Sequence, residues 1–228
     1  MVENDASNDW VLAFHGYMGS AAEVTPGAWR FHQWGYNVLM PEARGCGKSG
    51  GDYYAMGWDD RLDALDWIDL LNTEYGAANI YLFGVSMGGA TVMMITGEEL
   101  PGNVRAAVED CGYTSAKAEF AYQLKQLFGL PSFPVMDMAS LVTRIRAGYW
   151  LGEASALKQV KKSETPTLFI HGSADTFVPA EMVYEVYEAA TCEKELFVVE
   201  GAGHGGASAK GGDAYWWLVR DWFERHAR

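Results

Sequence analysis

The sequence predicts an α/β fold with a mostly parallel sheet of about six strands and helices on both faces. Short apolar runs alternate along the chain with longer amphipathic segments, an order of elements that builds a parallel sheet. Most of the short runs are continuously apolar, as strands buried on both faces are. We expect strands over residues 11–15, 36–41, 80–85, 104–109, 167–171 and 195–199.

Helices are expected between and after these strands. Apolar residues every three or four positions mark one face of a helix between the second and third strands: Trp58, Leu62, Leu65, Ile68, Leu71 and Tyr75. Gly76 would end that helix. Further helices are expected after Ser86, after Pro179 and over the C-terminal stretch that holds Trp216 and Phe223.

The segment between the fourth and fifth strands, about residues 112–164, is longer than an ordinary crossover. Structureless loops of that length are rare in compact domains, so we expect helices near residues 115–128 and 136–149. An insertion at the C-terminal edge of a parallel sheet lies above the ligand crevice. We therefore interpret this segment as a helical lid on a single domain of residues 1–228.

Large aromatic side chains are frequent in the expected lid. Such side chains either line an apolar pocket for acyl or aromatic groups or only pack the lid against the core, and the sequence leaves both interpretations open. The candidates for substrate binding are Phe120, Phe128, Phe133, Tyr149 and Trp150.

Charge and cysteine content exclude several classes of function. The chain has 30 acidic and 17 basic side chains, a net charge of −13 and no run rich in Lys or Arg. A polyanion would be repelled, so we expect no nucleic-acid partner, and an anionic membrane surface is disfavoured. The cysteines, Cys46, Cys111 and Cys192, are odd in number and widely spaced. They indicate neither a disulfide framework nor a zinc site, and we expect no metal and no cofactor.

The N-terminal residues are polar and acidic. They contain neither the basic region nor the apolar region of a signal peptide. The sequence as written therefore predicts a cytoplasmic protein. The alternative is a soluble domain of a membrane-anchored or secreted protein that has been trimmed at its N-terminus.

The strongest chemical signal is the sequence Gly84-Val85-Ser86-Met87-Gly88. It matches the pattern G-x-S-x-G, follows an apolar strand and precedes a helical run, which is the context of a nucleophile on a tight strand-to-helix turn. Small residues two before and two after the serine give such a turn room. We interpret Ser86 as a nucleophile.

A serine hydroxyl needs a base, and the base needs an orienting carboxylate. His204 lies in a glycine-rich loop after the last strand, at the edge of the sheet where Ser86 is expected. Asp175 follows the strand before that, and Asp110 is the alternative carboxylate. His15 and His171 end strands and are expected to brace loops.

An oxyanion hole is expected from two backbone N–H groups. One belongs to Met87, directly after the nucleophile. The other is expected in the sequence "HGYMGS" after the first strand, where the N–H of Tyr17 is the candidate.

Five motifs in this order resemble the α/β-hydrolase superfamily: "HGYMGS", "EARGCGKSGG", "GVSMGG", "HGSADTFVP" and "GAGH". The chain order Ser86, Asp175, His204 is the order of that superfamily. Within it, the chain is similar to bacterial serine hydrolases of the Bem46-like and S9-peptidase-like branch and to feruloyl-type esterases. Family members usually begin with two antiparallel strands, and these are apparently missing here. Dehalogenases and epoxide hydrolases carry Asp in place of Ser86, which argues against both.

The sequence "ARGCGKSGG" ends like a phosphate-binding P-loop. A P-loop has glycine five residues before Gly47, where this chain has Glu42. A carboxylate there would repel phosphates, so we exclude a nucleotide site. Arg44 is expected to anchor this loop to its neighbours.

The motifs together predict a serine hydrolase that cleaves small carboxylic esters through an acyl-enzyme. The alternatives are a serine peptidase or aminoacyl amidase on the same fold, and a non-catalytic binding protein. Perhydrolysis would use the same residues. The sequence leaves the acyl and alcohol specificity and the oligomeric state open.

Overall fold

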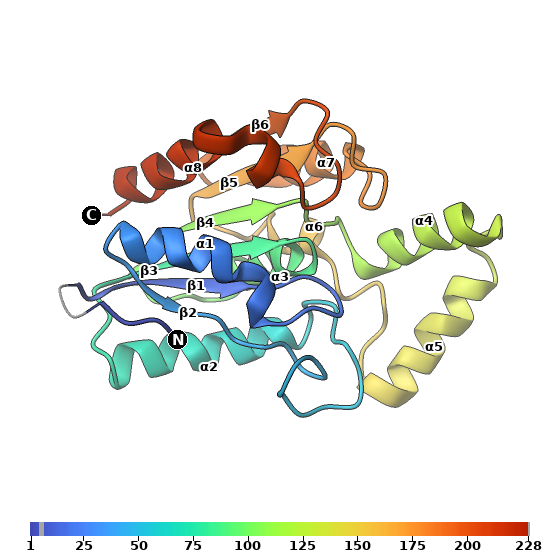
Figure 1. The fold of residues 1–228 in the computed structure, drawn as a ribbon. Coiled ribbons are helices and arrows are strands. Elements are labelled where there is room, and N and C mark those ends of the chain that lie inside the picture. The colour runs from blue at the N-terminus through green and yellow to red at the C-terminus, as the bar shows by residue number, and fades with distance from the viewer. Residues whose placement is uncertain (5–6, 228) are drawn as a thin grey trace.

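Six parallel strands form a single sheet in the computed structural model, which describes residues 1–4 and 7–227. The order across the sheet is β2-β1-β3-β4-β5-β6 (Figure 1). The predicted fold class and all six strands are confirmed. The strands are β1 (Asp9–Phe14), β2 (Asn37–Leu39), β3 (Asn79–Val85), β4 (Val104–Asp110), β5 (Thr167–Gly172) and β6 (Lys194–Val199).

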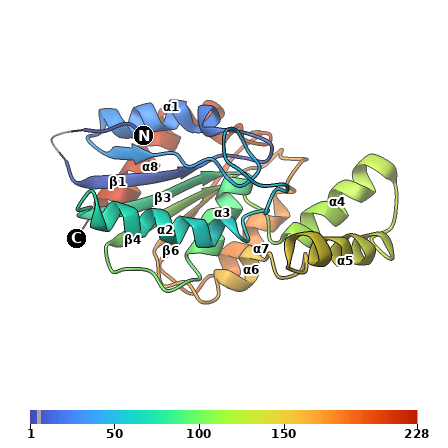
Figure 2. The same ribbon diagram turned by 90° about the horizontal axis from the view of Figure 1, so that it is seen from below.

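Helices cover both faces of this sheet because the side chains of each strand alternate between two apolar layers. On β1, Val11 and Ala13 pack toward α1 (Ala21–Gln33) and α8 (Ala207–Arg225). Trp10, Leu12 and Phe14 face the other layer. That layer is covered by α2 (Asp60–Thr73), α3 (Met87–Ile95) and α7 (Glu181–Ala189) (Figure 2).

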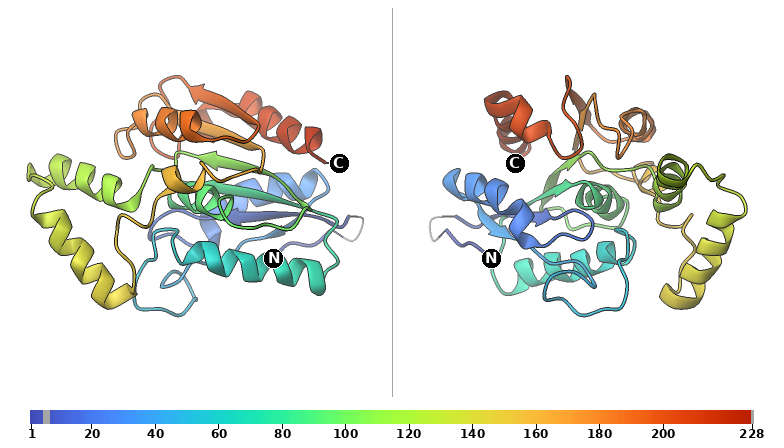
Figure 3. Two further views of the ribbon diagram at one scale, coloured as in Figure 1. Left: turned by 180° about the vertical axis from the view of Figure 1, so that it is seen from behind. Right: turned by 45° about the vertical axis from the view of Figure 1, so that its right-hand side comes forward.

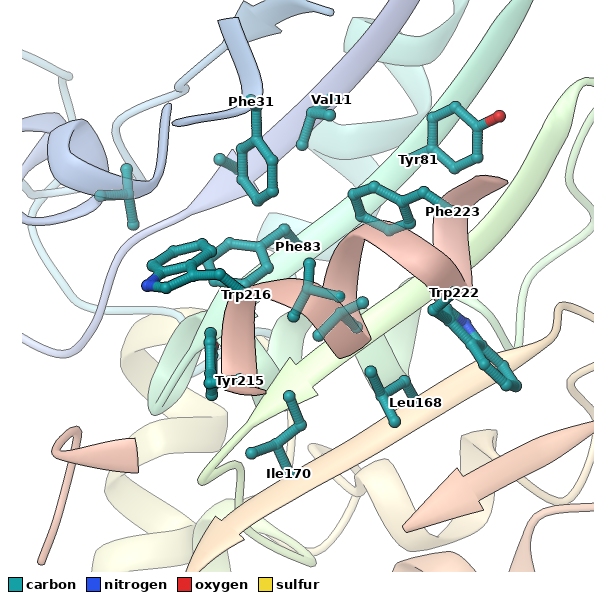
Figure 4. Close-up of a cluster of buried hydrophobic side chains, with 14 of the residues drawn as sticks. Val11, Phe31, Tyr81, Phe83, Leu168, Ile170, Tyr215, Trp216, Trp222 and Phe223 are labelled. Atoms are coloured by element: carbon teal, nitrogen blue, oxygen red, sulfur yellow. The ribbon is translucent and has the colours of Figure 1, made fainter. Parts of the chain in front are cut away.

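The layer under α1 and α8 is rich in aromatic rings (Figure 4). Phe223 of α8 lies on Tyr81 with ring centroids 4.6 Å apart, and Trp216 lies on Phe83 at 6.4 Å. These large rings dominate the buried area, and ring pairs add a further stabilisation of about 1 kcal/mol each. They hold α8, and with it the end of the loop that carries His204, against the sheet.

Three helices lie between β4 and β5. They are α4 (Ala116–Phe128), α5 (Val135–Ala147) and the short α6 (Ala156–Gln159). The first two correspond to the helices expected there, and α6 was not predicted. Ser115 caps α4 by accepting a hydrogen bond from the N–H of Ala118, as an N-cap serine does. Both long helices stand out beyond the edge of the sheet (Figure 1, Figure 3).

The outer faces of α4 and α5 are strongly apolar. Half of the large hydrophobic side chains that are exposed in the described chain lie between residues 127 and 150. They are Leu127, Phe128, Leu130, Phe133, Val135, Met138, Leu141, Val142, Ile145 and Trp150. This pair of helices therefore buries little of its own apolar surface against the rest of the molecule.

At the outer edge of β2, Val2 and Val38 form an isolated antiparallel bridge. The named strands of the described chain are all parallel. Among the described helices, none combines the length and apolar character needed to cross a bilayer.

Candidate active site

Ser86 lies on the tight turn between β3 and α3. Its backbone has φ 58° and ψ −119°, a conformation that costs a non-glycine residue of order 1–3 kcal/mol and persists only where the surroundings enforce it. A Cβ on Gly84 would lie 2.1 Å from the carbonyl oxygen of Gly88, and a Cβ on Gly88 would lie 2.2 Å from that of Phe14. Only glycine fits at either position, which is the physical basis of the G-x-S-x-G pattern.

His204 and Asp175 form a hydrogen-bonded chain with Ser86. The Nε2 atom of His204 lies 2.8 Å from the Oγ atom of Ser86, and its Nδ1 atom lies 2.7 Å from the Oδ2 atom of Asp175. The three residues come from the loops after β3, β5 and β6, which meet at one edge of the parallel sheet. The ring of Phe177 packs on the imidazole with centroids 4.8 Å apart.

The surroundings of Asp175 keep it ionised. Burial by itself raises the pKa of this carboxyl group, but hydrogen bonds from His171 and His204 outweigh burial and lower the pKa well below its usual range. The Oδ1 atom also accepts hydrogen bonds from the N–H groups of Phe177 and Val178, at 2.9 and 3.0 Å. The carboxylate therefore faces the imidazole as an anion in a fixed orientation.

Asp110, the alternative carboxylate, has a different partner. Its Oδ2 atom accepts a hydrogen bond from the hydroxyl group of Tyr215 at 2.8 Å. Burial raises its pKa to about 6. Its backbone carbonyl accepts a hydrogen bond from the N–H of Ser86. Asp110 thus supports the turn through its main chain, and Asp175 contacts the histidine.

The two strand-end histidines bridge loops. The Nδ1 atom of His15 lies 2.8 Å from the carbonyl oxygen of Gly16, and its Nε2 atom accepts a hydrogen bond from the N–H of Ala43. The Nε2 atom of His171 lies 3.0 Å from the carbonyl oxygen of Val178 and 3.4 Å from the Oδ2 atom of Asp175. His171 therefore braces the loop that carries Asp175 and also lies close to the Asp175 carboxylate. The sequence predicted the bracing of a loop but not the contact with Asp175.

The expected oxyanion donors lie beside Ser86. Met87 is the first residue of α3, so its N–H has no acceptor within the helix. A Cβ on Gly16 would lie 3.6 Å from the Cβ atom of Ser86, so the loop that carries Tyr17 passes close to the hydroxyl group. Within the described chain, neither the N–H of Met87 nor that of Tyr17 donates to a protein acceptor. Both are available to a developing anion.

A pocket of about 290 Å³ lies between the Tyr17 loop and the inserted helix α5. Two of the aromatic residues predicted to bind substrate, Phe120 and Tyr149, line it. Phe128 and Phe133 are 70% and 75% exposed, and with the exposed Trp150 they lie outside it. The sequence missed the rest of its wall: Tyr53, Tyr54, Met56, Val142, Thr143, Arg146, Ala147 and Leu151.

The loop with the sequence "ARGCGKSGG" is held by its own carboxylate. The Oε2 atom of Glu42 accepts a hydrogen bond from the N–H of Lys48 at 2.6 Å, and a Cβ on Gly47 would meet the same carboxylate at 2.2 Å. The anion occupies the place that a phosphate would need, which supports the exclusion of a nucleotide. Arg44 pairs with Asp63 through two hydrogen bonds of 2.6 and 2.5 Å, an anchoring role.

One group in the described chain has the spacing of metal ligands. Candidate ligand atoms of Cys111, Asp175 and His204 lie within 4.8 Å of one another. Burial raises the pKa of the Cys111 thiol well above its usual value, and a protonated thiol is a poor ligand. The imidazole and the carboxylate are already hydrogen-bonded to each other. The chemistry of this group therefore does not suit a metal ion.

More than half of the chain matches the model of a known family. Residues 5–139 match Hydrolase_4, described as serine aminopeptidase, S33. The chain belongs to this S33 family. Its resemblance to serine hydrolases of the α/β-hydrolase superfamily is thereby confirmed, and the narrower likeness to the Bem46-like and feruloyl-esterase branches stays a prediction.

Solved structures share the fold of this S33-family protein over nearly its whole length. An esterase of Pyrococcus furiosus, Pf2001, is 25% identical, with a TM-score of 0.80 over 99% of this chain and 86% of its own. A monoacylglycerol lipase of Paleococcus ferrophilus is 21% identical, with a TM-score of 0.68 over 95% of this chain and 94% of its own.

Curated relatives are longer than this S33-family chain. The uncharacterized protein YqkD of Bacillus subtilis is 28% identical over 83% of this chain and 63% of its own length. The uncharacterized protein YfhR of Escherichia coli K12 is 27% identical over 90% of this chain and 66% of its own length. The chain thus spans a little less than two thirds of these relatives.

Proposed function

We propose that this S33-family protein is a serine hydrolase that cleaves small carboxylic esters. The observation that carries the proposal is the hydrogen-bonded chain from Ser86 through His204 to the buried, ionised Asp175. A hydroxyl group, a base and an orienting anion in this arrangement are the parts of a nucleophilic acyl-transfer site. The likeness to an esterase and a lipase supports the same chemistry.

The proposed reaction uses each of these groups in turn. The Oγ atom of Ser86 attacks the ester carbonyl carbon while His204 takes the hydroxyl proton. The N–H groups of Met87 and Tyr17 stabilise the negative oxygen of the tetrahedral intermediate. The bond to the alcohol then breaks, His204 gives its proton to the leaving oxygen, and the acyl group remains on Ser86. Water repeats the sequence and releases the acid.

Asp175 contributes by holding the imidazole and by stabilising its charged form. It does not need to accept the proton, since its lowered pKa keeps it ionised while the ring is charged. In the same proposal, α4 and α5 form the lid over a single catalytic domain. Residues of both helices line the pocket that also includes Tyr17, which supports this role.

The proposal is tested by replacing Ser86 with Ala and measuring hydrolysis of p-nitrophenyl acetate and butyrate. We expect kcat to fall at least about a thousandfold, the scale seen when the nucleophile of such a site is removed. Ser49→Ala is the control, because its hydroxyl group donates to the carbonyl oxygen of Glu42 in another loop. Retained turnover by Ser86→Ala, or failure of a fluorophosphonate probe to label the wild-type serine, would contradict the proposal.

A peptidase is the second candidate, and the family description, serine aminopeptidase, favours it. Cleavage of an amide uses the same nucleophile and base as cleavage of an ester. The amine of an amide is a poorer leaving group than the alcohol of an ester, so it must be protonated as it leaves. Leucine p-nitroanilide and p-nitrophenyl butyrate, assayed with the same enzyme, separate the two activities. A higher kcat/KM on the anilide would assign the protein to the peptidases.

A further inference from the structure

The pocket beside the Tyr17 loop has one free cation at its wall. Arg146 of α5 lines the pocket, is exposed, and makes no hydrogen bond or ion pair within the part of the chain that the structure describes. Its neighbour Arg144 differs, since it donates to the carbonyl oxygen of Gly148 and lies outside the pocket. Four other arginines of this acidic protein, Arg44, Arg61, Arg220 and Arg225, form ion pairs with carboxylates.

The remaining wall is apolar and aromatic, and it carries two phenol groups without a hydrogen-bond partner among the described residues. The rings of Tyr17 and Tyr54 meet edge to face at 5.1 Å. Neither hydroxyl group has a protein partner among the described residues, whereas those of Tyr53 and Tyr149 are bonded to Asp59 and to the carbonyl oxygen of Ala55. The pocket thus combines an aliphatic and aromatic lining with hydrogen-bond donors and a guanidinium group, which suits an alkyl chain that ends in an anion.

The position of the pocket assigns it to the acyl side of an ester. The leaving oxygen must lie near the Nε2 atom of His204, which protonates it. No lining residue comes from the loops that hold Asp175 and His204. The lining includes instead Tyr17, the residue whose N–H faces the carbonyl oxygen in the proposed reaction. A group in this pocket therefore extends from the carbonyl carbon away from the alcohol.

The inserted segment that forms the α5 side of the pocket is locally basic, although the whole chain is acidic. Residues 112–150 contain four basic and two acidic side chains, within a chain of net charge −13. One of the two acids, Asp137, pairs with Lys117, and the other, Glu119, is 4% exposed. At the wall formed by Tyr53, Asp59 accepts a hydrogen bond from the tyrosine hydroxyl group, so the basic side of the pocket is the α5 side, where Arg146 lies.

We infer that this pocket binds an acyl chain with a terminal carboxylate, held by Arg146, so that the substrates are half-esters of dicarboxylic acids. The inference rests on the proposed function and names its substrate class. The chain packs against Met56 and the tyrosine rings, and the guanidinium group takes the carboxylate in two parallel hydrogen bonds.

The test compares two methyl esters that differ only at the end of the acyl chain. Monomethyl adipate ends in a carboxylate, and methyl hexanoate ends in a methyl group. We expect Arg146→Gln to lower kcat/KM for monomethyl adipate about tenfold, the low end for a charged hydrogen bond at a solvent-exposed site. The kcat/KM for methyl hexanoate, which has no carboxylate, should change by a smaller factor, so the ratio of the two values falls. Arg144→Gln is the matched control, with the same charge change two residues earlier, and it leaves the ratio of the two rates unaltered.

The inference is overturned if Arg146→Gln leaves the ratio unaltered, or if Arg144→Gln lowers it equally, which would indicate only a general electrostatic attraction. Failure of the proposed function looks different, because the wild type would then hydrolyse neither ester. In that case calorimetric titration of the Ser86→Ala protein with monomethyl adipate decides. Binding that is lost on adding Arg146→Gln supports the site, and equal binding with and without Arg146, or none at all, overturns it.

Discussion

Asp175 and Glu109 are both buried carboxyl groups, and their surroundings drive them to opposite charge states. Asp175 accepts hydrogen bonds from His204 and two N–H groups, and its Oδ2 atom lies 3.4 Å from the Nε2 atom of His171. Glu109 is fully buried, its Oε2 atom accepts one hydrogen bond from the N–H of Gly112, and its Oε1 atom has no hydrogen-bond partner among the described residues. Burial therefore raises the pKa of Glu109 to about 8, and the group is a neutral acid at pH 7.

The free energy of unfolding should respond to the protonation of Glu109. Its pKa is higher in the folded protein than the ordinary value of 4.5, so the folded state binds the proton more tightly, and stability falls as pH rises from about 4.5 to 8. Glu109→Gln removes this loss. Relative to the wild type, the variant should gain more than about 1 kcal/mol between pH 5 and pH 8.

Urea unfolding at the two pH values measures this difference. Glu185→Gln on the exposed face of α7 is the control, and its stability relative to the wild type should not change with pH. If the difference in the free energy of unfolding between Glu109→Gln and the wild type were the same at both pH values, the pKa of the Glu109 carboxyl group would not be raised in the folded protein, which would contradict the prediction.

At the scale of an element, the turn from β3 into α3 depends on how closely three backbones approach. The helix begins at Met87 directly after a serine with positive φ, and Gly88 touches the end of β1 through the carbonyl oxygens of Phe14 and His15. Ser86, the first turn of α3 and the start of the Tyr17 loop are therefore one packed unit. A change in any of them should move the N–H groups of Met87 and Tyr17, which are the proposed oxyanion donors.

Gly88→Ala tests this packing. The added Cβ would lie 2.2 Å from the carbonyl oxygen of Phe14, and since backbone must shift to admit it, we expect a loss of about 2–3 kcal/mol in the free energy of unfolding. Gly102→Ala adds the same atom where nothing lies within 4 Å and should be nearly neutral. Equal stability of the two variants, measured by urea unfolding, would contradict the close approach.

At the scale of the whole molecule, the inserted helices α4 and α5 bury fewer apolar side chains than the sheet does. Two buried clusters lie in the sheet and its covering helices, and a third reaches into the insertion through Met136, Tyr149 and Leu151. The helices α4 and α5 carry many exposed apolar side chains and extend away from that core (Figure 3). The outer part of the insertion therefore contributes less to stability than the sheet does.

A matched pair of substitutions measures this contrast. Phe169→Ala removes a ring that is 0% exposed and should cost about 3–5 kcal/mol. Phe128→Ala removes one that is 70% exposed and should change stability by no more than about 0.5 kcal/mol. Thermal or urea unfolding of both variants compares them directly. A large loss in Phe128→Ala would mean that the end of α4 packs against another surface in solution.

The elements that the sequence predicted well have a local cause. Apolar runs such as that of β3 reveal strands because burial on both faces leaves no polar position. Ser86, Asp175 and His204 could be named because each follows a strand, and the ends of parallel strands meet at one edge of the sheet. The short helix α6 was missed since one turn leaves no periodic pattern to detect.

The sequence by itself determined the sheet, the turn that carries Ser86 and the candidates for its two partners, because those features depend on periodicity and on small residues at fixed spacing. The sequence already favoured Asp175 over Asp110, and only the tertiary structure showed the contact of Asp175 with His204. Only the tertiary structure showed Glu42 filling the loop that resembles a P-loop and placed Arg146 with Tyr17 and Tyr54 around one pocket. Each of these depends on contacts between segments far apart in the chain, and such contacts have no local pattern.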